Sequence, residues 1–316
     1  FFLYITLYSS FPDEKISLKD FPMTSIIDSL DQISEKYNVL FCDIWGCIHN
    51  GKHAIPSALK ALSAFRRNQG YVMLLTNAPR PKSAIKTHLE KMNITEEYYD
   101  DITTSGDAAQ LSMFSGTVGY NVYHLGPKRD EAFFSEYPKD ISAKRSIARV
   151  PLKKAEGIVC TGLFDDSYQT PEDYRLTIEH GVRNHLKLLC VNPDIFVDIG
   201  RQRVWCAGGI AEAFSKAGGE SIYCGKPHTD IYKLAYVKIK RFNQKDEPRI
   251  LCIGDGIKTD ILGGINEGLD TLFICGGLSG NETGITKIGD NPDPERLNSF
   301  LTINNLKPTN SIGFLK

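Results

Sequence analysis

The chain has 316 residues, and its 37 Lys and Arg residues nearly balance its 38 Asp and Glu residues, for a formal net charge of −1. The length corresponds to about two domains, and a composition of 41% hydrophobic and 24% charged residues is that of a globular protein. Collagen-like, disordered and membrane-embedded chains are therefore excluded. The balanced charge gives no reason to expect nucleic acid or a membrane as a partner.

The N-terminal segment 1–23 is apolar at its start but is too short to span a bilayer and lacks the basic residues of a signal peptide. We expect it to be an extension that contributes little to function. The eight cysteines lie mostly in or beside apolar runs, and no C-x-x-C pair is present, which argues against a zinc knuckle or a redox dithiol. This usage indicates a reducing, cytoplasmic setting.

The first elements alternate between helix and strand. An amphipathic helix is predicted over 26–37, and Val39–Cys42 follows as a strand that is apolar on both faces. The next helix has its apolar residues on one face, at Leu59, Leu62 and Phe65. A second buried strand is predicted over 71–75.

The alternation continues with further short strands, predicted over 121–125, 157–160, 188–191, 221–224, 250–253 and 271–275. A capping box with Pro at the first helical position, Thr170-Pro171-Glu172-Asp173, opens one of the helices between them. Strands that alternate with helices imply an α/β fold with a parallel sheet and right-handed crossovers.

Polar residues directly follow four of these strands. They are Asp43, Thr76-Asn77, Gly225-Lys226 and Asp255. Ligand sites of such sheets lie beyond the carboxyl ends of the strands. We therefore expect these residues to meet at one edge.

The segment from Gly254 to Asp260 places two carboxylates, Asp255 and Asp260, five residues apart at a strand end and the next helix start. Together with Asp43 they make three carboxylates, which raise each other's pKa unless a cation compensates them. Oxygen ligands with room for water and phosphate favour Mg²⁺. A helix N-cap is the alternative for any single Asp, but three converging carboxylates fit it poorly.

The other strand-end residues are suited to binding an anion. Lys226 can hold a phosphate or neutralise a carboxylate nucleophile. Thr76 and Asn77 offer a hydroxyl, an amide and backbone N–H groups. Taken singly, each has an ordinary alternative: a solvated surface lysine for Lys226, and a turn or helix cap for Thr76 and Asn77.

These stretches, in this order, resemble the four motifs of the haloacid dehalogenase-like (HAD) superfamily of hydrolases. The matching stretches are Asp43-Ile44-Trp45-Gly46, Thr76, Gly225-Lys226-Pro227, and Gly254-Asp255 with Thr259-Asp260. The resemblance implies a Rossmann-like parallel sheet core of the HAD type.

Thr76 and Lys226 are 226 − 76 = 150 residues apart, too far for a loop, and the insert has predicted strands and helices of its own, so it should be a separate domain. The resemblance implies that this domain is an α/β cap of the C2 type. We expect a core of 24–82 and 205–316 and a cap of 83–204. With Asn50-Gly51 after the first motif and Asn192-Pro193-Asp194 near the end of the cap, the chain resembles the class IIA, NagD-like subgroup. This subgroup includes nucleotide and sugar phosphatases.

The resemblance implies Mg²⁺-dependent hydrolysis of a small phosphorylated metabolite, such as a sugar phosphate or nucleotide. Asp43 would attack phosphorus to form an aspartyl-phosphate while Mg²⁺ and Lys226 neutralise charge. Asp43, the carbonyl of Trp45 and Asp255 would hold the Mg²⁺, with Asp260 as a ligand or a support.

Thr76, Asn77, Gly46 and Lys226 would bind the phosphoryl group. Caps of this type often dimerise in relatives, so a homodimer through the cap is a further option that the resemblance raises.

The sequence departs from the family pattern at Trp45. In phosphatases of the superfamily this position usually carries a second Asp, which protonates the leaving group and activates water, and an indole can do neither. Three alternatives stay open. Another group, such as His49, replaces the acid/base; the protein is a metal-independent, dehalogenase-type hydrolase; or it binds phosphate and Mg²⁺ as a regulatory module without efficient turnover.

Specificity is expected to come from the cap. Polar residues that would face the cleft, if they are not simply solvated surface residues, are Arg80, Lys128-Arg129, Asp194 and Arg201-Gln202-Arg203. Hinges are predicted near 77–82 and 205–209, where Pro and Gly cluster.

Overall fold

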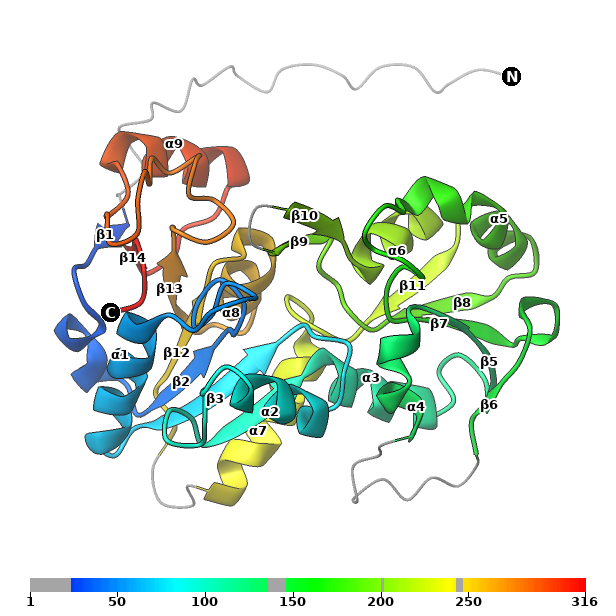
Figure 1. Cartoon of the computed structure of the whole chain (residues 1–316), viewed down its shortest axis with the longest axis horizontal. Coiled ribbons are helices and arrows are strands. Elements are labelled where there is room, and N and C mark those ends of the chain that lie inside the picture. The colour runs from blue at the N-terminus through cyan, green and yellow to red at the C-terminus, as the bar shows by residue number, and fades with distance from the viewer. Residues whose placement is uncertain (1–23, 136–145, 200–201, 243–246) are drawn as a thin grey trace, which may run out of the picture.

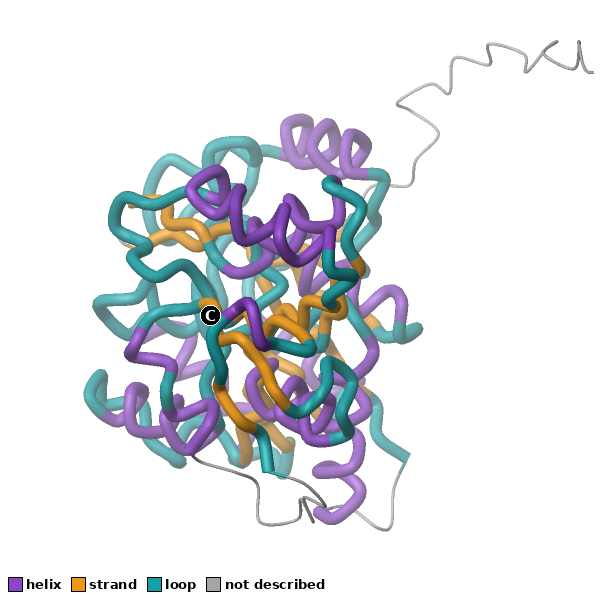
Figure 2. The backbone as a smooth tube through the Cα atoms, turned by 90° about the vertical axis from the view of Figure 1, so that its right-hand side faces the viewer, coloured by secondary structure: helices purple, strands orange, loops and turns teal. Residues whose placement is uncertain are grey.

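The computed structural model describes residues 24–135, 146–199, 202–242 and 247–316, so the predicted extension 1–23 lies outside the described residues. Two parallel sheets, each with its own helices, lie side by side as a core and a cap (Figure 1). Seen from the side, helices and loops surround the strands (Figure 2). The prediction of an α/β fold with a parallel sheet is confirmed.

The core sheet has seven parallel strands in the order β1-β14-β13-β12-β2-β3-β4. Their bounds are Ser25–Ile26 (β1), Val39–Cys42 (β2), Tyr71–Thr76 (β3), Asp101–Thr104 (β4), Ile250–Gly254 (β12), Asp270–Ile274 (β13) and Asn310–Ile312 (β14). The helices around it are Pro56–Arg67 (α1), Lys82–Glu90 (α2), Ser105–Phe114 (α3), Thr229–Phe242 (α7), Leu262–Asn266 (α8) and Pro294–Asn304 (α9).

Side-chain alternation along β2 builds the two layers that flank this sheet. Leu40 and Cys42 belong to the apolar cluster that contains residues of α1 and α2. Val39 and Phe41 point to the opposite face, into the cluster that contains residues of α3 and α7. All four side chains are buried, as expected for a parallel strand with both faces covered.

The cap sheet has five parallel strands in the order β11-β8-β7-β5-β6. Their bounds are Asn121–Leu125 (β5), Ala148–Arg149 (β6), Gly157–Cys160 (β7), Lys187–Cys190 (β8) and Glu220–Tyr223 (β11). The cap helices are Ala132–Ser135 (α4), Arg175–Arg183 (α5) and Ala207–Lys216 (α6), and Phe196–Ile199 (β9) pairs antiparallel with Gln202–Trp205 (β10).

The cap packs against the core through an apolar contact. On one face of the cap sheet, Ile158 and Cys160 belong to a cluster with residues of α5 and α6. On the other face, Val159 and Leu189 join the cluster that contains α3 and α7 of the core. None of the described helices has the length and apolar character needed to cross a membrane.

Most strands predicted from buried runs are confirmed, and so is the capping box at Thr170, whose N–H donates to Asp173 Oδ2 at 2.8 Å. The box opens a 3₁₀ turn, Pro171–Tyr174, that leads into α5. The helix predicted over 26–37 is wrong. This segment forms β1 and two 3₁₀ turns, Leu30–Gln32 and Ser34–Lys36, because β1 pairs with β14 at the other end of the chain, which local periodicity cannot reveal.

The predicted domain boundaries at 82 and 205 also require correction. The core sheet continues to β4, and α3 packs against α7, so the first core segment extends beyond residue 82. The last cap strand is β11, so the cap extends beyond residue 205 to about residue 223. The Pro- and Gly-rich segments that suggested hinges therefore lie within the two domains, not between them.

Candidate active site

Strand register brings the first and fourth sequence motifs together. Cys42, the last residue of β2, pairs with Ile253 of β12 on one side and with Leu74 of β3 on the other. Asp43 follows, and its N–H donates to the carbonyl of Ile253 at 2.8 Å. Asp43 therefore lies level with the ends of both neighbouring strands, where Asp255 and Thr76 emerge.

Lys226 completes this cluster from the direction of the cap. Its Nζ donates to Oδ1 of Asp43, Oδ1 of Asp260 and the carbonyl of Leu75, each at 2.6 Å. These three hydrogen bonds use the whole donor capacity of the ammonium group. The strand before Lys226 is β11 of the cap sheet, so the expectation that Lys226 follows a core strand is wrong, because a short buried run does not specify which sheet it joins.

Negative charge exceeds positive charge in this cluster. Asp43, Asp255 and Asp260 are only 8%, 5% and 6% exposed, and Lys226 is the one cation in contact with them among the described residues. Burial raises the pKa of Asp43, although Lys226 opposes this. Burial alone would lower the pKa of Lys226, but the carboxylates of Asp260 and Asp43 outweigh it and raise the pKa, so the ammonium stays charged.

The residues present fit a divalent cation. Asp43, Cys47 and Asp255 each offer one ligand atom, and these atoms lie within 4.8 Å of one another. Burial, followed by the charges of Asp43 and Asp260, raises the pKa of Asp255 well above its usual value, so a cation beside it would relieve a real electrostatic cost. Cys47 was not identified from the sequence; burial raises the pKa of its thiol, which is therefore neutral.

Glycines on two loops make room for the carboxylate of Asp255. A Cβ atom at Gly46 would lie 2.1 Å from Oδ2 of Asp255, and one at Gly277 would lie 2.0 Å from the same atom. The N–H of Leu278 donates to this oxygen at 2.9 Å. The backbone on both sides of Asp255 is therefore packed closely against it, including the Trp45–Gly46 peptide whose carbonyl is a predicted metal ligand.

Asp260 has both carboxylate oxygens engaged. Oδ1 accepts from Lys226, and Oδ2 accepts from the N–H of Gly256 at 3.0 Å. Asp260 lies in a π-helical turn, Ile257–Ile261, a feature often found at functional sites. Of the two roles predicted from the sequence, ligand or support, this geometry favours a support that orients Lys226.

The loop after Asp43 folds back on itself. Gly46 has a φ of +79°, and its N–H donates to the carbonyl of His49 at 2.9 Å. Gly46 therefore has no amide available for phosphate, which corrects its predicted role as a phosphate ligand. The indole of Trp45 packs over Gly51, where a Cβ would lie 2.5 Å from the ring.

His49, the proposed replacement acid/base, is 1% exposed. Burial and the nearby His88 lower its pKa to about 4, so the ring is neutral at pH 7. Its Nδ1 accepts from the N–H of Gly51 at 2.9 Å, and its ring centre lies 5.2 Å from that of Trp45 and 6.1 Å from that of His88. These contacts describe a structural histidine within the loop and do not support proton transfer.

Thr76 and Asn77 differ in what they can offer an anion. Oγ1 of Thr76 accepts from the N–H of Ala78 at 3.2 Å, which leaves its own hydroxyl hydrogen to donate. The Asn77 side chain is already engaged: Oδ1 accepts from the N–H of Lys226 at 2.7 Å, and Nδ2 donates to the carbonyl of Lys226 at 3.0 Å and to Oδ1 of Asp194 at 2.8 Å. Asn77 therefore clamps Lys226, and only its backbone could meet phosphate.

The residues predicted as possible cleft contacts divide into two groups. Arg80 and Asp194 are half-buried, which is less exposure than a fully solvated surface side chain has. The exposed residues are Lys128, Arg129, Gln202 and Arg203, and Arg201 lies outside the described residues. Asp194, which the sequence analysis named as a possible cleft residue, contacts Asn77 of the second motif.

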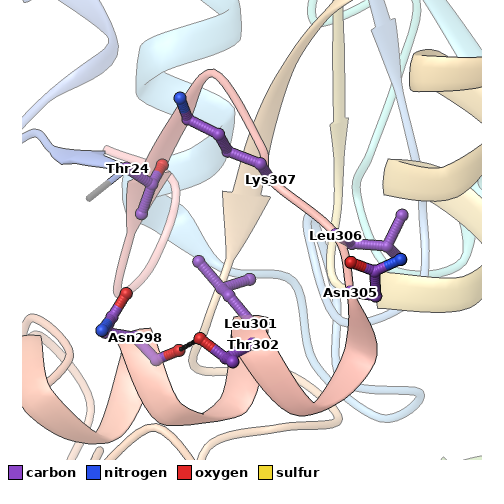
Figure 3. Close-up of a pocket in the computed structure, with 7 residues that line it drawn as sticks. All are labelled: Thr24, Asn298, Leu301, Thr302, Asn305, Leu306 and Lys307. Atoms are coloured by element: carbon purple, nitrogen blue, oxygen red, sulfur yellow. Dashed lines mark hydrogen bonds between the residues drawn. The ribbon is translucent and has the colours of Figure 1, made fainter. Parts of the chain in front are cut away.

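A small pocket elsewhere in the core does not belong to this site. It lies between α9, at Asn298, Leu301 and Thr302, and the segment 305–307 that follows the helix, with Thr24 at one side (Figure 3). No carboxylate lines it. It offers none of the chemistry expected at the strand ends.

Comparisons with known proteins agree with the motifs. The family model described as "Haloacid dehalogenase-like hydrolase" matches residues 40–138, and a HAD-hydrolase-like model matches residues 223–299. An acid sugar phosphatase from Staphylococcus saprophyticus is 24% identical over 252 residues, which cover 78% of this chain and 90% of that protein.

Solved structures include a haloacid dehalogenase-like hydrolase from Brucella suis, 32% identical with a TM-score of 0.79, covering 92% of this chain and all of that one. A 4-nitrophenylphosphatase from Thermotoga maritima shares the fold, at 18% identity and a TM-score of 0.64, covering 88% of this chain and 95% of that one. With its four motifs gathered at one sheet edge and a relative of this similarity, the chain belongs to the haloacid dehalogenase-like family of hydrolases.

Proposed function

We propose that the protein is a Mg²⁺-dependent phosphatase that hydrolyses a phosphate monoester of a small metabolite through an aspartyl-phosphate on Asp43. The observation that carries this proposal is the contact of Lys226 Nζ with both Asp43 and Asp260, in a cluster that also holds the buried Asp255, whose pKa is raised well above its usual value. Relatives named acid sugar phosphatase and 4-nitrophenylphosphatase support it.

Each residue has a role that follows from its contacts. Lys226 fixes the orientation of the Asp43 carboxylate through Oδ1 and brings positive charge to the place where phosphoryl oxygens would gather. The hydroxyl of Thr76 is free to donate to one of these oxygens. Asp43 and Asp255, with the carbonyl of Trp45, would hold Mg²⁺, which supplies the charge that neutralises the phosphoryl group during in-line displacement.

The alternatives predicted from the sequence fit the structure less well. A metal-independent carbon–halogen site has little use for Asp255, which is buried beside Asp43 and Asp260 at an electrostatic cost. A regulatory module that binds without turnover agrees with Trp45, but Lys226 is already oriented on the nucleophile as catalysis requires. We therefore favour turnover.

The proposed substrate class is a sugar phosphate, nucleotide or similar metabolite, and the relative named acid sugar phosphatase supports the first of these. The proposed setting is the reducing cytoplasm, and it is supported by the eight cysteines, each of which is buried and unpaired.

The test is phosphate release from a panel of sugar phosphates, nucleotides and 4-nitrophenyl phosphate, with Mg²⁺ or with EDTA. Asp43→Asn keeps the shape of the nucleophile but removes its charge, and Asp31→Asn, at an exposed position, is the control. Release that needs Mg²⁺, persists in Asp31→Asn and disappears in Asp43→Asn supports the proposal. Chloride release from 2-haloacids without metal, or phosphate binding without turnover, would instead support one of the alternatives.

A further inference from the structure

The proposed reaction needs a proton donor that the expected position lacks. Trp45 can only donate a hydrogen bond from its indole N–H, and its pyrrole-type proton is not transferred. His49 is buried, neutral and bonded to Gly51. The group that protonates the leaving oxygen must therefore come from elsewhere around the Asp43 cluster.

The segment Asn192-Pro193-Asp194, which follows cap strand β8, packs directly against the loops that carry Asn77 and Gly225. The hydroxyl of Ser105, at the start of α3, donates to the carbonyl of Val191. A Cβ at Gly225 would lie 2.7 Å from Cδ of Pro193 and 2.5 Å from Oδ1 of Asn77. This segment, which follows cap strand β8, thus packs on the second and third motifs with no space between.

Asp194 is fixed both by its backbone and by its side chain. Its N–H donates to Oδ1 of Asn192 at 3.0 Å, and its carbonyl accepts from Gly208 at 3.1 Å. Its Oδ1 accepts from Nδ2 of Asn77 at 2.8 Å, the same nitrogen that donates to the carbonyl of Lys226. The other carboxylate oxygen, Oδ2, makes no hydrogen bond within the part of the chain that the structure describes. The carboxyl group is therefore oriented, with one oxygen open.

An in-line displacement on Asp43 needs a proton on the side of the site that faces the cap. In an in-line displacement the leaving oxygen is opposite Asp43, so it points away from the sheet edge and toward the cap. Asp194 is carried by the connection that descends from the cap sheet to the Asn77–Lys226 clamp. Burial and the charge of Asp194 both raise the pKa of Asp43, so the carboxyl group of Asp194 lies within electrostatic reach of the nucleophile.

We propose that Asp194 is the general acid and base of this site, in place of the aspartate that Trp45 replaces; this inference rests on the proposed phosphatase function. In the first step Asp43 forms a bond to phosphorus, the bond from phosphorus to the leaving oxygen breaks, and the proton of Asp194 moves to that oxygen to give the alcohol. In the second step Asp194 takes a proton from water as the water oxygen attacks phosphorus. The bond from phosphorus to Asp43 breaks in the same displacement, its electron pair returns to the Asp43 carboxylate, and phosphate is released.

The electrostatic surroundings suit both steps. Burial raises the pKa of Asp194 to about 6, and the negative charge of Asp260 acts in the same direction. The hydrogen bond from Asn77 and the charge of Lys226 act against the rise. Asp43 and the thiols of Cys190 and Cys206 are the other titratable groups that interact with it. Near neutral pH both protonation states are accessible, as a group that gives and then takes a proton requires.

Asp194 could instead serve only to position Asn77, and Asp194→Asn separates the two roles. Asparagine keeps an oxygen that accepts from Asn77 but cannot transfer a proton. The measurement is kcat/KM for a sugar phosphate, whose alkoxide needs protonation, and for 4-nitrophenyl phosphate, whose acidic phenol leaves without it. The exposed Asp165→Asn on the cap is the matched control, and urea unfolding verifies that the variants are folded.

If Asp194 is the general acid, Asp194→Asn should lower kcat/KM much more for the sugar phosphate than for 4-nitrophenyl phosphate. For Asp194→Asn we expect kcat/KM for the sugar phosphate to fall by at least about 100-fold, against less than about tenfold for the aryl ester. The alkaline limb of the pH profile, which reports the acid form, should disappear for the sugar phosphate. Equal losses on both substrates with an unchanged pH profile would assign a positioning role, and unchanged activity would assign none; either overturns the inference.

Failure of the proposed function looks different from failure of this inference. If the wild-type protein releases no phosphate from either substrate, or if Asp43→Asn is as active as wild type, the phosphatase proposal fails and Asp194 loses its role with it. If wild type is active and Asp43→Asn is inactive while Asp194→Asn shows no selective loss, only the assignment of Asp194 is wrong.

Discussion

Replacing Lys226 with Met should destabilise the folded protein, because it removes the one ammonium group that holds two buried carboxylates. Methionine retains most of the apolar stem but cannot donate the three hydrogen bonds to Asp43, Asp260 and Leu75. Breaking a buried ion pair by removing one partner costs about 3–5 kcal/mol. The site limits this cost, because a carboxylate that loses its partner can take up a proton.

Asp260 provides an estimate of that limit. Its pKa is raised from 3.8 to about 6 in the presence of Lys226. At pH 7.5, a carboxyl group with an unfolded pKa of 3.8 that stays fully protonated in the folded state lowers the free energy of unfolding by about 5 kcal/mol. A carboxyl group with a folded pKa of about 6 lowers it by about 3 kcal/mol. Asp260 alone therefore accounts for about 2 kcal/mol, and Asp43 with the carbonyl of Leu75 raises the expected total to about 3–4 kcal/mol.

The assay is urea unfolding at pH 7.5 in EDTA, followed by circular dichroism. The control is Lys216→Met, which removes an exposed pair with Glu212 at 3.0 Å and should change the unfolding free energy by less than about 0.5 kcal/mol. A loss of less than about 1 kcal/mol for Lys226→Met would refute the view that Lys226 neutralises this cluster.

Three further changes probe other parts of the site. In Gly277→Ala, the added Cβ would lie 2.0 Å from Oδ2 of Asp255 and displace this carboxylate. The Mg²⁺ concentration for half-maximal activity should therefore rise at least about tenfold. An unchanged Mg²⁺ titration would contradict a metal site at Asp255. Thr76→Val removes a hydroxyl donor, so the inhibition constant of inorganic phosphate should rise about tenfold or more, and equal inhibition would remove Thr76 from the phosphate site. His49 has its pKa lowered from 6.5 to about 4, so the neutral ring stabilises the fold above pH 6.5 and this contribution is lost as the pH falls. Between pH 7.5 and 4.5, wild type should lose about 2–3 kcal/mol more than His49→Gln in urea unfolding, and parallel pH curves would show that the ring is not buried in its neutral form.

The centre of the site could be predicted from the sequence because it depends on local order. Asp43 and Asp255 directly follow buried parallel strands, and neighbouring parallel strands end at the same edge. The alternation of helices and strands in the core was predictable for the same reason. The spacing of Thr76 and Lys226 was enough to predict an inserted cap.

Long-range partners could not be predicted in the same way. β11 has the pattern of any buried strand, and nothing in its residues indicates that it joins the cap sheet and delivers Lys226 from that side. The amide of Asn77 was expected to meet phosphate, but it binds Lys226 and Asp194, which are distant in the chain. Gly46 has the right position for an anion ligand, yet its N–H is used by a turn whose shape depends on His49.

The most direct test of the central claim is a crystal structure of the protein soaked with MgCl₂ and tungstate, a phosphate mimic. We expect the tungstate in contact with Asp43 and the hydroxyl of Thr76, close to the charge of Lys226, and a Mg²⁺ ion bound by Asp43 and Asp255. Tungstate bound elsewhere, with no metal at Asp255 under saturating Mg²⁺, would contradict a shared site for a divalent cation and a phosphoryl group.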